Sequence, residues 1–173
     1  WISGFTGSAG TAVVTLDRAA LWTDSRYFIA AAEQLAGTEY RLMKLRVEGT
    51  PTVCEWLADE LAAYEKPIVG LDGNVNSFAE VAALTQELAT RGNIRVRTDA
   101  DPMATLWTAR PAIPGHKVCL HPLKYAGETT ASKISRIRKN LAVRGADGLL
   151  VTALDEIAWV LNLRGSDVHC NPV

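Results

Sequence analysis

The chain has few cysteines and no long apolar run, and each absence excludes a class of protein. Its three cysteines, Cys54, Cys119 and Cys170, are odd in number and widely spaced, so they form no disulfide framework and favour a reducing, cytoplasmic location. No apolar stretch approaches the roughly 20 residues that span a bilayer, so we expect no membrane partner. The chain has neither an initial methionine nor a secretory signal, and we expect both of its ends to be cut from a longer sequence.

An excess of one charge is also missing, because 18 Lys and Arg residues stand against 19 Asp and Glu residues. The basic residues gather at 95–144, where 10 of them accompany 3 acidic residues. A nucleic-acid surface would place aromatic side chains among such charges, but this segment has only Trp107 and Tyr125. We therefore expect a solvated face, or a surface that meets an acidic neighbouring domain, and no nucleic-acid partner.

The glycine run GFTGSAGT at residues 4–11 lacks the surroundings of a phosphate loop. Such a loop follows a strand and precedes a helix, whose N–H groups then point at the anion. Here the glycines precede a predicted strand hairpin, and no Gly-Lys-Ser/Thr follows them. We expect the glycines to allow a tight turn or bulge at the entrance to the first strand.

Signatures of metal sites and catalytic nucleophiles are missing as well. His116, Cys119 and His121 form a HxxCxH cluster, which matches neither paired CxxC nor HExxH spacing, so we expect a connector histidine and a buried Cys119. No GxSxG turn surrounds any serine, and no catalytic-cysteine signature is present. We expect no metal site and no catalytic residue in this chain.

The sequence does contain strands alternating with helices. β-Branched and apolar runs at 10–16 and 19–24, separated by two residues, predict a β-hairpin. Capping residues and apolar periodicity predict the other elements. The expected helices lie at 26–36, 53–64, 77–88, 101–107, 132–144 and from 154 onward, and the expected strands lie at 39–45, 67–73, 94–97, 117–123 and 148–152. This order indicates an α/β fold with a mixed sheet flanked by helices.

Two further segments bear on organisation and on a site. RPAIPGHK at 110–117 has prolines that exclude a helix, and its composition is typical of a connector between domains. In WTDSRYF, Asp24 ends a predicted strand and Arg26 starts a helix. We expect Asp24 to bond locally to backbone or to Arg26, although Arg26 could also reach outward into a neighbouring site.

Several motifs together resemble those of the cytosolic long-type Xaa-Pro aminopeptidases, in the creatinase/prolidase group. The motifs are SGFTGSAGTAVVT, LWTDSRYF, LWTARP and VTALDEIAWVLNLRGSDV, followed by NPV at the end of the chain. The resemblance implies a ribonuclease-H-like amino-terminal domain at 1–110 without its opening helix and strand, a linker at 111–117, and the truncated start of a second related domain at 118–173. It also implies an unfilled sheet edge beside 10–16. Either the strand at 148–152 fills this edge, within one chain or between two, or that strand belongs to a separate, half-built second domain held by a crystal or dimer contact.

The same resemblance implies a function for the parent protein. In that family, a pita-bread catalytic domain holds two divalent metals, usually manganese, and removes the first residue of peptides whose second residue is proline. The metal ligands would lie beyond this chain, which is therefore expected to hold no cofactor and to be inactive alone. It would shape the substrate pocket, contact its own catalytic domain and support a homodimer. Arg26, Asn162, Arg164 and Asp167 are the candidates for the pocket rim. The alternative is a non-catalytic assembly or recognition module of the same architecture.

Overall fold

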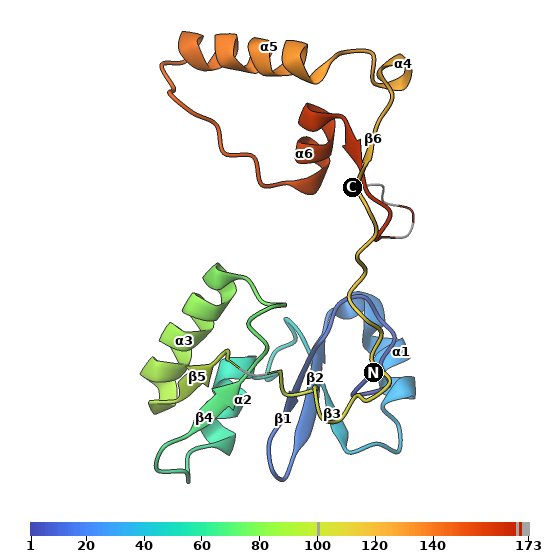
Figure 1. Ribbon diagram of the computed structural model, residues 1–173. Coiled ribbons are helices and arrows are strands. Elements are labelled where there is room, and N and C mark those ends of the chain that lie inside the picture. Colours follow the sequence, from blue (N-terminus) through green and yellow to red (C-terminus); the bar gives the residue numbers. More distant parts are fainter. Residues whose placement is uncertain (100, 169, 171–173) are drawn as a thin grey trace. The chain divides into compact units, whose positions relative to one another are not determined.

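The computed structural model describes residues 1–99, 101–168 and 170, and the chain divides into two units, Trp1–Thr108 and Ala109–Val173 (Figure 1). Among the described residues, the first unit contains a three-stranded sheet, a two-stranded sheet and three α-helices, and the second contains three α-helices and one pair of short strands. No helix among the described residues is long and apolar enough to cross a membrane.

The three-stranded sheet begins with the predicted hairpin. Strands β1 (Thr11–Val14) and β2 (Ala19–Thr23) pair antiparallel, and β3 (Tyr40–Lys44) joins β2 in parallel, in the order β1-β2-β3. A parallel neighbour cannot be reached by a tight turn, so a helical crossover connects β2 to β3. The sheet is therefore mixed, as the sequence predicted.

The crossover consists of the short helix η1 (Ser25–Tyr27) and α1 (Phe28–Gln34). Asp24 caps this segment, because its carboxylate accepts a hydrogen bond from the Arg26 N–H. Gly37 then takes a φ of +76°, a left-handed conformation that reverses the chain after the helix at little steric cost.

Two helices of the first unit start with the same local device. In α2 (Val53–Glu60) and α3 (Phe78–Gly92), the residue before the helix and the glutamate at its third position cap each other's backbone N–H groups. The pairs are Thr52 with Glu55 and Ser77 with Glu80. These helices connect to a parallel pair of strands, β4 (Ile68–Gly70) and β5 (Arg95–Arg97).

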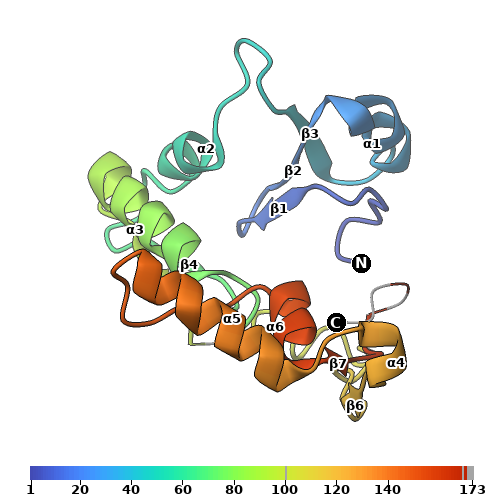
Figure 2. The ribbon, with the colours of Figure 1, turned by 90° about the horizontal axis from the view of Figure 1, so that it is seen from above.

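Side chains of β2 divide between the two faces of its sheet. Ala20 and Trp22 belong to the buried cluster that includes Trp56 and Leu57 of α2, whereas Leu21, one position away along the strand, points to the opposite face. Figure 2 shows α1 on one side of this sheet and α2 with α3 on the other. Each face of β2 is thus covered by helix, which explains why its central residues are all buried.

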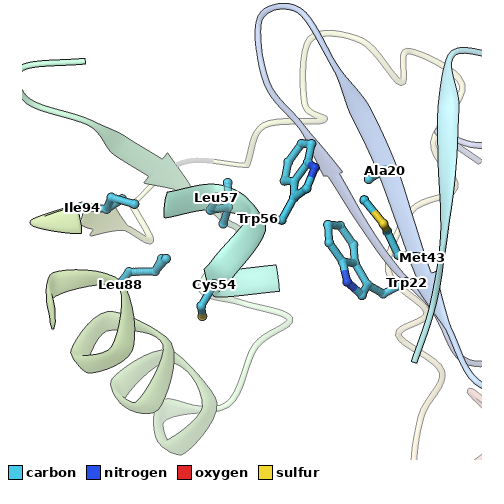
Figure 3. Packing of buried hydrophobic residues seen from close by; sticks show 8 residues of the cluster. All are labelled: Ala20, Trp22, Met43, Cys54, Trp56, Leu57, Leu88 and Ile94. Atoms are coloured by element: carbon cyan, nitrogen blue, oxygen red, sulfur yellow. The ribbon is translucent and has the colours of Figure 1, made fainter. Parts of the chain in front are cut away.

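A contact between two tryptophans packs the three-stranded sheet against α2, and through it connects to the core beside the second sheet. The rings of Trp22 on β2 and Trp56 on α2 lie 5.5 Å apart, edge to face, and Leu88 and Ile94 continue the same cluster toward β5 (Figure 3). The indole Nε1 of Trp22 donates to the Pro51 carbonyl at 2.8 Å, so its polar atom is satisfied inside the core. One apolar layer therefore extends from the hairpin to β5.

The outer edge of β1 has the unfilled position that the sequence predicted. Within the described residues, β1 pairs only with β2, and β4 pairs only with β5. However, the predicted strand at 148–152 is wrong: this segment has no strand conformation and pairs with neither sheet, and Leu150 is 87% exposed. An apolar run becomes a strand only beside a partner that completes its hydrogen bonds, and among the described residues the segment 148–152 pairs with no strand.

The second unit is built around two longer helices. Strand β6 (Cys119–Leu120) and the short helix α4 (Leu123–Ala126) precede α5 (Thr130–Val143), and α6 (Leu154–Leu161) leads into β7 (Leu163–Arg164), which pairs antiparallel with β6. Thr129 caps α5, which begins two residues before the predicted start at 132. The two-residue ladder of β6 with β7 therefore connects the early part of the second unit to the segment after α6.

Three other predictions from the sequence fail locally. The segment 102–106 forms turns instead of a helix. Helix α2 ends at Glu60 rather than at residue 64, because turns at 61–63 lead the chain toward β4. The strand predicted at 67–73 is shortened to β4 (Ile68–Gly70), which has a neighbour on one side only among the described strands. In each case, tertiary surroundings outweigh the local pattern.

The buried cluster gives the first testable prediction. Leu88→Ala should lower the free energy of unfolding by about 2–5 kcal/mol in urea denaturation, because the fully buried Leu88 side chain would leave a cavity. Leu16→Ala, at a position 85% exposed, is the matched control and should change it by less than about 0.5 kcal/mol. Equal effects of the two substitutions would contradict the assigned core.

Candidate functional site

At the end of β2, Asp24 and Arg26 form a closed local pair. The Arg26 guanidinium donates from Nε to Oδ1 at 2.9 Å and from Nη2 to Oδ2 at 2.7 Å, and the Arg26 N–H also donates to Oδ1. These bonds to Arg26 lower the pKa of Asp24 from 3.8 to about 2. The predicted local bonding of Asp24 is confirmed. The Arg26 side chain is 66% exposed, so its outer surface remains accessible to solvent.

The glycine run lies beside this pair and is held by α1 and its neighbouring turn. Ser8 Oγ lies 2.6 Å from the Tyr27 hydroxyl, and the Tyr27 ring meets Phe5 edge to face. A Cβ at Gly7 would overlap the Phe5 ring, so a larger residue does not fit there without rearrangement. Gly4 has a φ of +72°. The glycines therefore serve close approach and a turn, as predicted, and no helix N-terminus follows them.

In the second unit, Asn162 ends α6 and is bonded on three sides. It takes a left-handed φ of 51°, and its Oδ1 accepts a hydrogen bond from Lys133 Nζ at 2.6 Å. Its Nδ2 donates to the Glu128 carbonyl at 2.9 Å, and its own carbonyl accepts from the His121 N–H at 2.7 Å. Asn162 is only 9% exposed, so its side chain connects protein segments to one another.

Arg164 and Asp167 also contact their own unit. Arg164 Nη1 donates to the carbonyls of Ala158 and Leu163, which turns the guanidinium back toward the end of α6. Asp167 Oδ1 accepts from the backbone N–H of His116 at 2.9 Å and lies 2.8 Å from His116 Nδ1. Both contacts with His116 lower the pKa of Asp167. This pair ties residue 116 to the segment after β7.

Lys133 is a central residue of this arrangement that the sequence analysis did not single out. Its side chain is buried, its Nζ lies 4.3 Å from the centre of the Trp159 ring, and it donates to the Trp159 carbonyl. On a basic helix it resembles the solvated lysines around it. The sequence did contain one indication that Lys133 is buried. It lies four residues before Ile137 and eight before Leu141, and this spacing places it on the apolar side of α5.

The described residues do not provide a site for a metal ion. Among them, no three or more His, Cys, Asp or Glu side chains group as ligands would. Within the HxxCxH cluster, the His121 ring packs near Tyr125, and Cys119 is exposed rather than buried as predicted, because β6 is a short edge strand. The described residues therefore group no set of ligands for a metal ion.

The structure brings three of the four rim candidates together. Asn162, Arg164 and Asp167 lie on one continuous segment that starts at the end of α6, whereas Arg26 belongs to the first unit. Each has a different partner inside the unit: Asn162 bonds Lys133, Arg164 bonds the Ala158 carbonyl, and Asp167 bonds His116.

Comparison with known proteins places both units in one family. The sequence-family model for the creatinase/prolidase N-terminal domain matches residues 1–103, and a second family model with the same description matches residues 109–173. The chain belongs to the creatinase/prolidase N-terminal domain family. The expected resemblance to Xaa-Pro aminopeptidases is also confirmed by the individual relatives.

Relatives of this creatinase/prolidase chain match it over its whole length. It is 44% identical to "Probable Xaa-Pro aminopeptidase P" of Aspergillus flavus and 44% identical to Aminopeptidase P2 of Arabidopsis thaliana, with 100% of this chain and 26% and 24% of those proteins covered. The crystal structure of X-prolyl aminopeptidase from Caenorhabditis elegans, described as a cytosolic enzyme with a di-nuclear active site, matches with a TM-score of 0.78 at 34% identity. That match covers 99% of this chain and 28% of the other. The chain thus spans about a quarter of the length of these relatives.

The pairing of Asp24 with Arg26 gives a prediction for pH titration. In Arg26→Gln, the pKa of Asp24 should rise from about 2 toward 3.8, because the guanidinium no longer stabilises the carboxylate. Since the pKa in the folded protein is below that of the unfolded chain, the stabilisation by this pair is present above about pH 4 and disappears as the pH falls to 2. NMR titration of the carboxyl carbon measures the change, with Arg41→Gln on β3 as control. If the pKa of Asp24 stayed near 2 in Arg26→Gln, a group other than the Arg26 guanidinium would be stabilising the carboxylate.

Proposed function

We propose that this chain is the amino-terminal, non-catalytic region of a metal-dependent Xaa-Pro aminopeptidase, which removes the first residue of peptides whose second residue is proline. The match that supports this most strongly runs through both units: 99% of the chain superposes on one X-prolyl aminopeptidase with a TM-score of 0.78. Both curated relatives described above carry aminopeptidase names and also align along the entire chain. In this proposal, residues 1–110 form the first domain, 111–117 the linker and 118–173 the start of the second.

The metals of the proposed enzyme would be bound outside this chain. Two divalent ions are proposed because the Caenorhabditis elegans relative is described as having a di-nuclear active site, and manganese is the first ion to test. The described residues of this chain offer no group of three ligands for either ion. The chemical step is therefore assigned to the remainder of the enzyme, in a cytoplasmic protein that we propose to be a homodimer.

The role proposed for this region is to shape the peptide pocket together with its own catalytic domain. Arg26 is the rim candidate whose geometry leaves a charged group partly available, since its guanidinium is paired on one edge and is 66% exposed. Asn162, Arg164 and Asp167 use their side chains for contacts within the second unit. For these three, the proposed contribution is the shape of the rim.

Extension of the reading frame beyond Val173 tests the proposal most directly. A continuation with two Asp, two Glu and one His in the order of the family would support the enzyme. The longer protein should then release the first residue from an Xaa-Pro peptide with manganese, and should leave the matched Xaa-Ala peptide intact. A continuation without those ligands, in a protein that folds and cleaves neither peptide, would favour the assembly or recognition module instead.

The isolated 173-residue chain should cleave no Xaa-Pro peptide, with or without manganese, because its described residues group no set of metal ligands. Liquid chromatography of the released amino acid provides the measurement, and the longer protein at equal concentration is the positive control. Manganese-dependent release of the first residue by the isolated chain would contradict the assignment of chemistry to the missing part.

Arg26→Ala in the longer enzyme separates a scaffold role from a pocket role. If Arg26 reaches the peptide, KM should rise about tenfold while the melting temperature stays within a few degrees of the unsubstituted protein, because only a solvent-facing ion pair is lost. Arg41→Ala is the matched control. A lower melting temperature with unchanged KM and kcat would assign Arg26 to the scaffold alone.

A further inference from the structure

Lys133 is a buried cation whose partners all lie at the end of α6. Its side chain is 2% exposed, and its Nζ donates to Asn162 Oδ1 at 2.6 Å and to the Trp159 carbonyl at 2.8 Å. The Trp159 ring lies 4.3 Å from the same nitrogen. An ammonium group loses its hydration on burial, so these contacts must replace the water that it gives up.

The partners of Lys133 fix where the chain goes after α6. Asn162 is the residue at which the helix ends, and its left-handed backbone turns the chain into β7. Because Lys133 holds Oδ1 while Nδ2 binds the Glu128 carbonyl, the Asn162 side chain is held from two directions. The Asn162 carbonyl in turn accepts the His121 N–H, which places this turn against the segment after β6.

The segment positioned in this way carries two further rim candidates. Arg164 lies two residues after Asn162 and bonds back to the Ala158 carbonyl of α6, and Asp167 lies three residues further and bonds to His116. A shift of Asn162 would therefore change the start of the whole segment 163–167. Lys133 itself is too buried to meet a peptide.

We propose that Lys133 is a positioning residue for the peptide pocket: through Asn162, it fixes the direction of segment 163–167 and so the shape of the rim. This inference rests on the proposed aminopeptidase function. A displacement of about 1 Å at a site remote from the chemistry is able to reduce catalytic efficiency by up to about a hundredfold. The buried lysine then has a consequence for peptide binding in addition to its effect on stability.

The first test compares Lys133→Met with Lys139→Met in the longer enzyme. Both substitutions replace a lysine of α5 by an unbranched apolar side chain, but Lys139 is exposed and serves as the matched control. We expect KM for an Xaa-Pro peptide to rise about tenfold in Lys133→Met, with kcat changed less than twofold, at a temperature where circular dichroism shows the protein folded. Lys139→Met should leave both parameters unchanged. A lower melting temperature with unchanged KM would overturn the proposal.

A double-mutant cycle shows whether Lys133 acts through Asn162. Asn162→Gly keeps the left-handed backbone accessible but removes the side chain that Lys133 holds. It should raise KM as Lys133→Met does, and the double variant should raise it no further, because both changes remove the same contact. Asn162→Gly leaves the buried Lys133 ammonium with one hydrogen-bond acceptor fewer, whereas Lys133→Met removes the charge, so the two variants lose stability for different reasons. If one of them fails to fold, the other still provides the KM measurement. Independent, multiplicative effects would contradict action through Asn162.

Amide hydrogen exchange in the 173-residue chain gives a readout that does not depend on catalysis. In Lys133→Met, the His121 amide, which bonds the Asn162 carbonyl, should exchange at least tenfold faster, while the Leu21 amide in the first unit should not change. An unchanged His121 amide would overturn the positioning role. If the longer enzyme lacks Xaa-Pro activity altogether, the proposed function fails, and the exchange rates alone decide whether Lys133 fixes the segment.

Discussion

The edge-to-face contact of Trp22 with Trp56 is the interaction on which the first unit depends. Trp22 lies on the central strand of one sheet, and Trp56 lies on the helix that packs toward the other, so the two rings join parts of the chain that share no backbone ladder. The hydrogen bond from Trp22 Nε1 to the Pro51 carbonyl sets the start of α2 against β2. Leu57, Leu88 and Ile94 then extend one apolar layer to β5.

The second unit is held together in a different way. Among its described residues, Ala158 is the one buried apolar side chain, while Lys133 and Asn162 are buried polar groups. Hydrogen bonds of Asn162 to Lys133, Glu128 and His121 therefore connect α5, the end of α6 and the segment after β6. The stability of such a unit depends more on hydrogen-bond geometry than on buried apolar area, because each buried polar atom must keep its partner.

The sequence predicted correctly those features that depend on interactions between residues close together in the chain. Two residues between apolar runs predicted the hairpin, and the expected helix at 77–88 placed the start of α3 within one residue, because turns and caps involve neighbours only a few residues apart. The strand predicted at 148–152 failed, since its apolar pattern needs a partner strand that the pattern does not contain. Asp24 and Arg26 were predicted as a local pair because only one residue separates them.

The sequence by itself determined the family and the α/β class, which rest on short motifs and on the order of apolar runs. The rim candidates also come from those motifs and stay a prediction. Only the tertiary structure decided that Lys133 is buried, that Asn162 turns inward and that Asp167 bonds to His116. Those contacts join residues 29 and 51 positions apart. A lysine on a basic helix has the same local pattern whether it faces solvent or core, and the packing of α6 against α5 is what distinguishes the two.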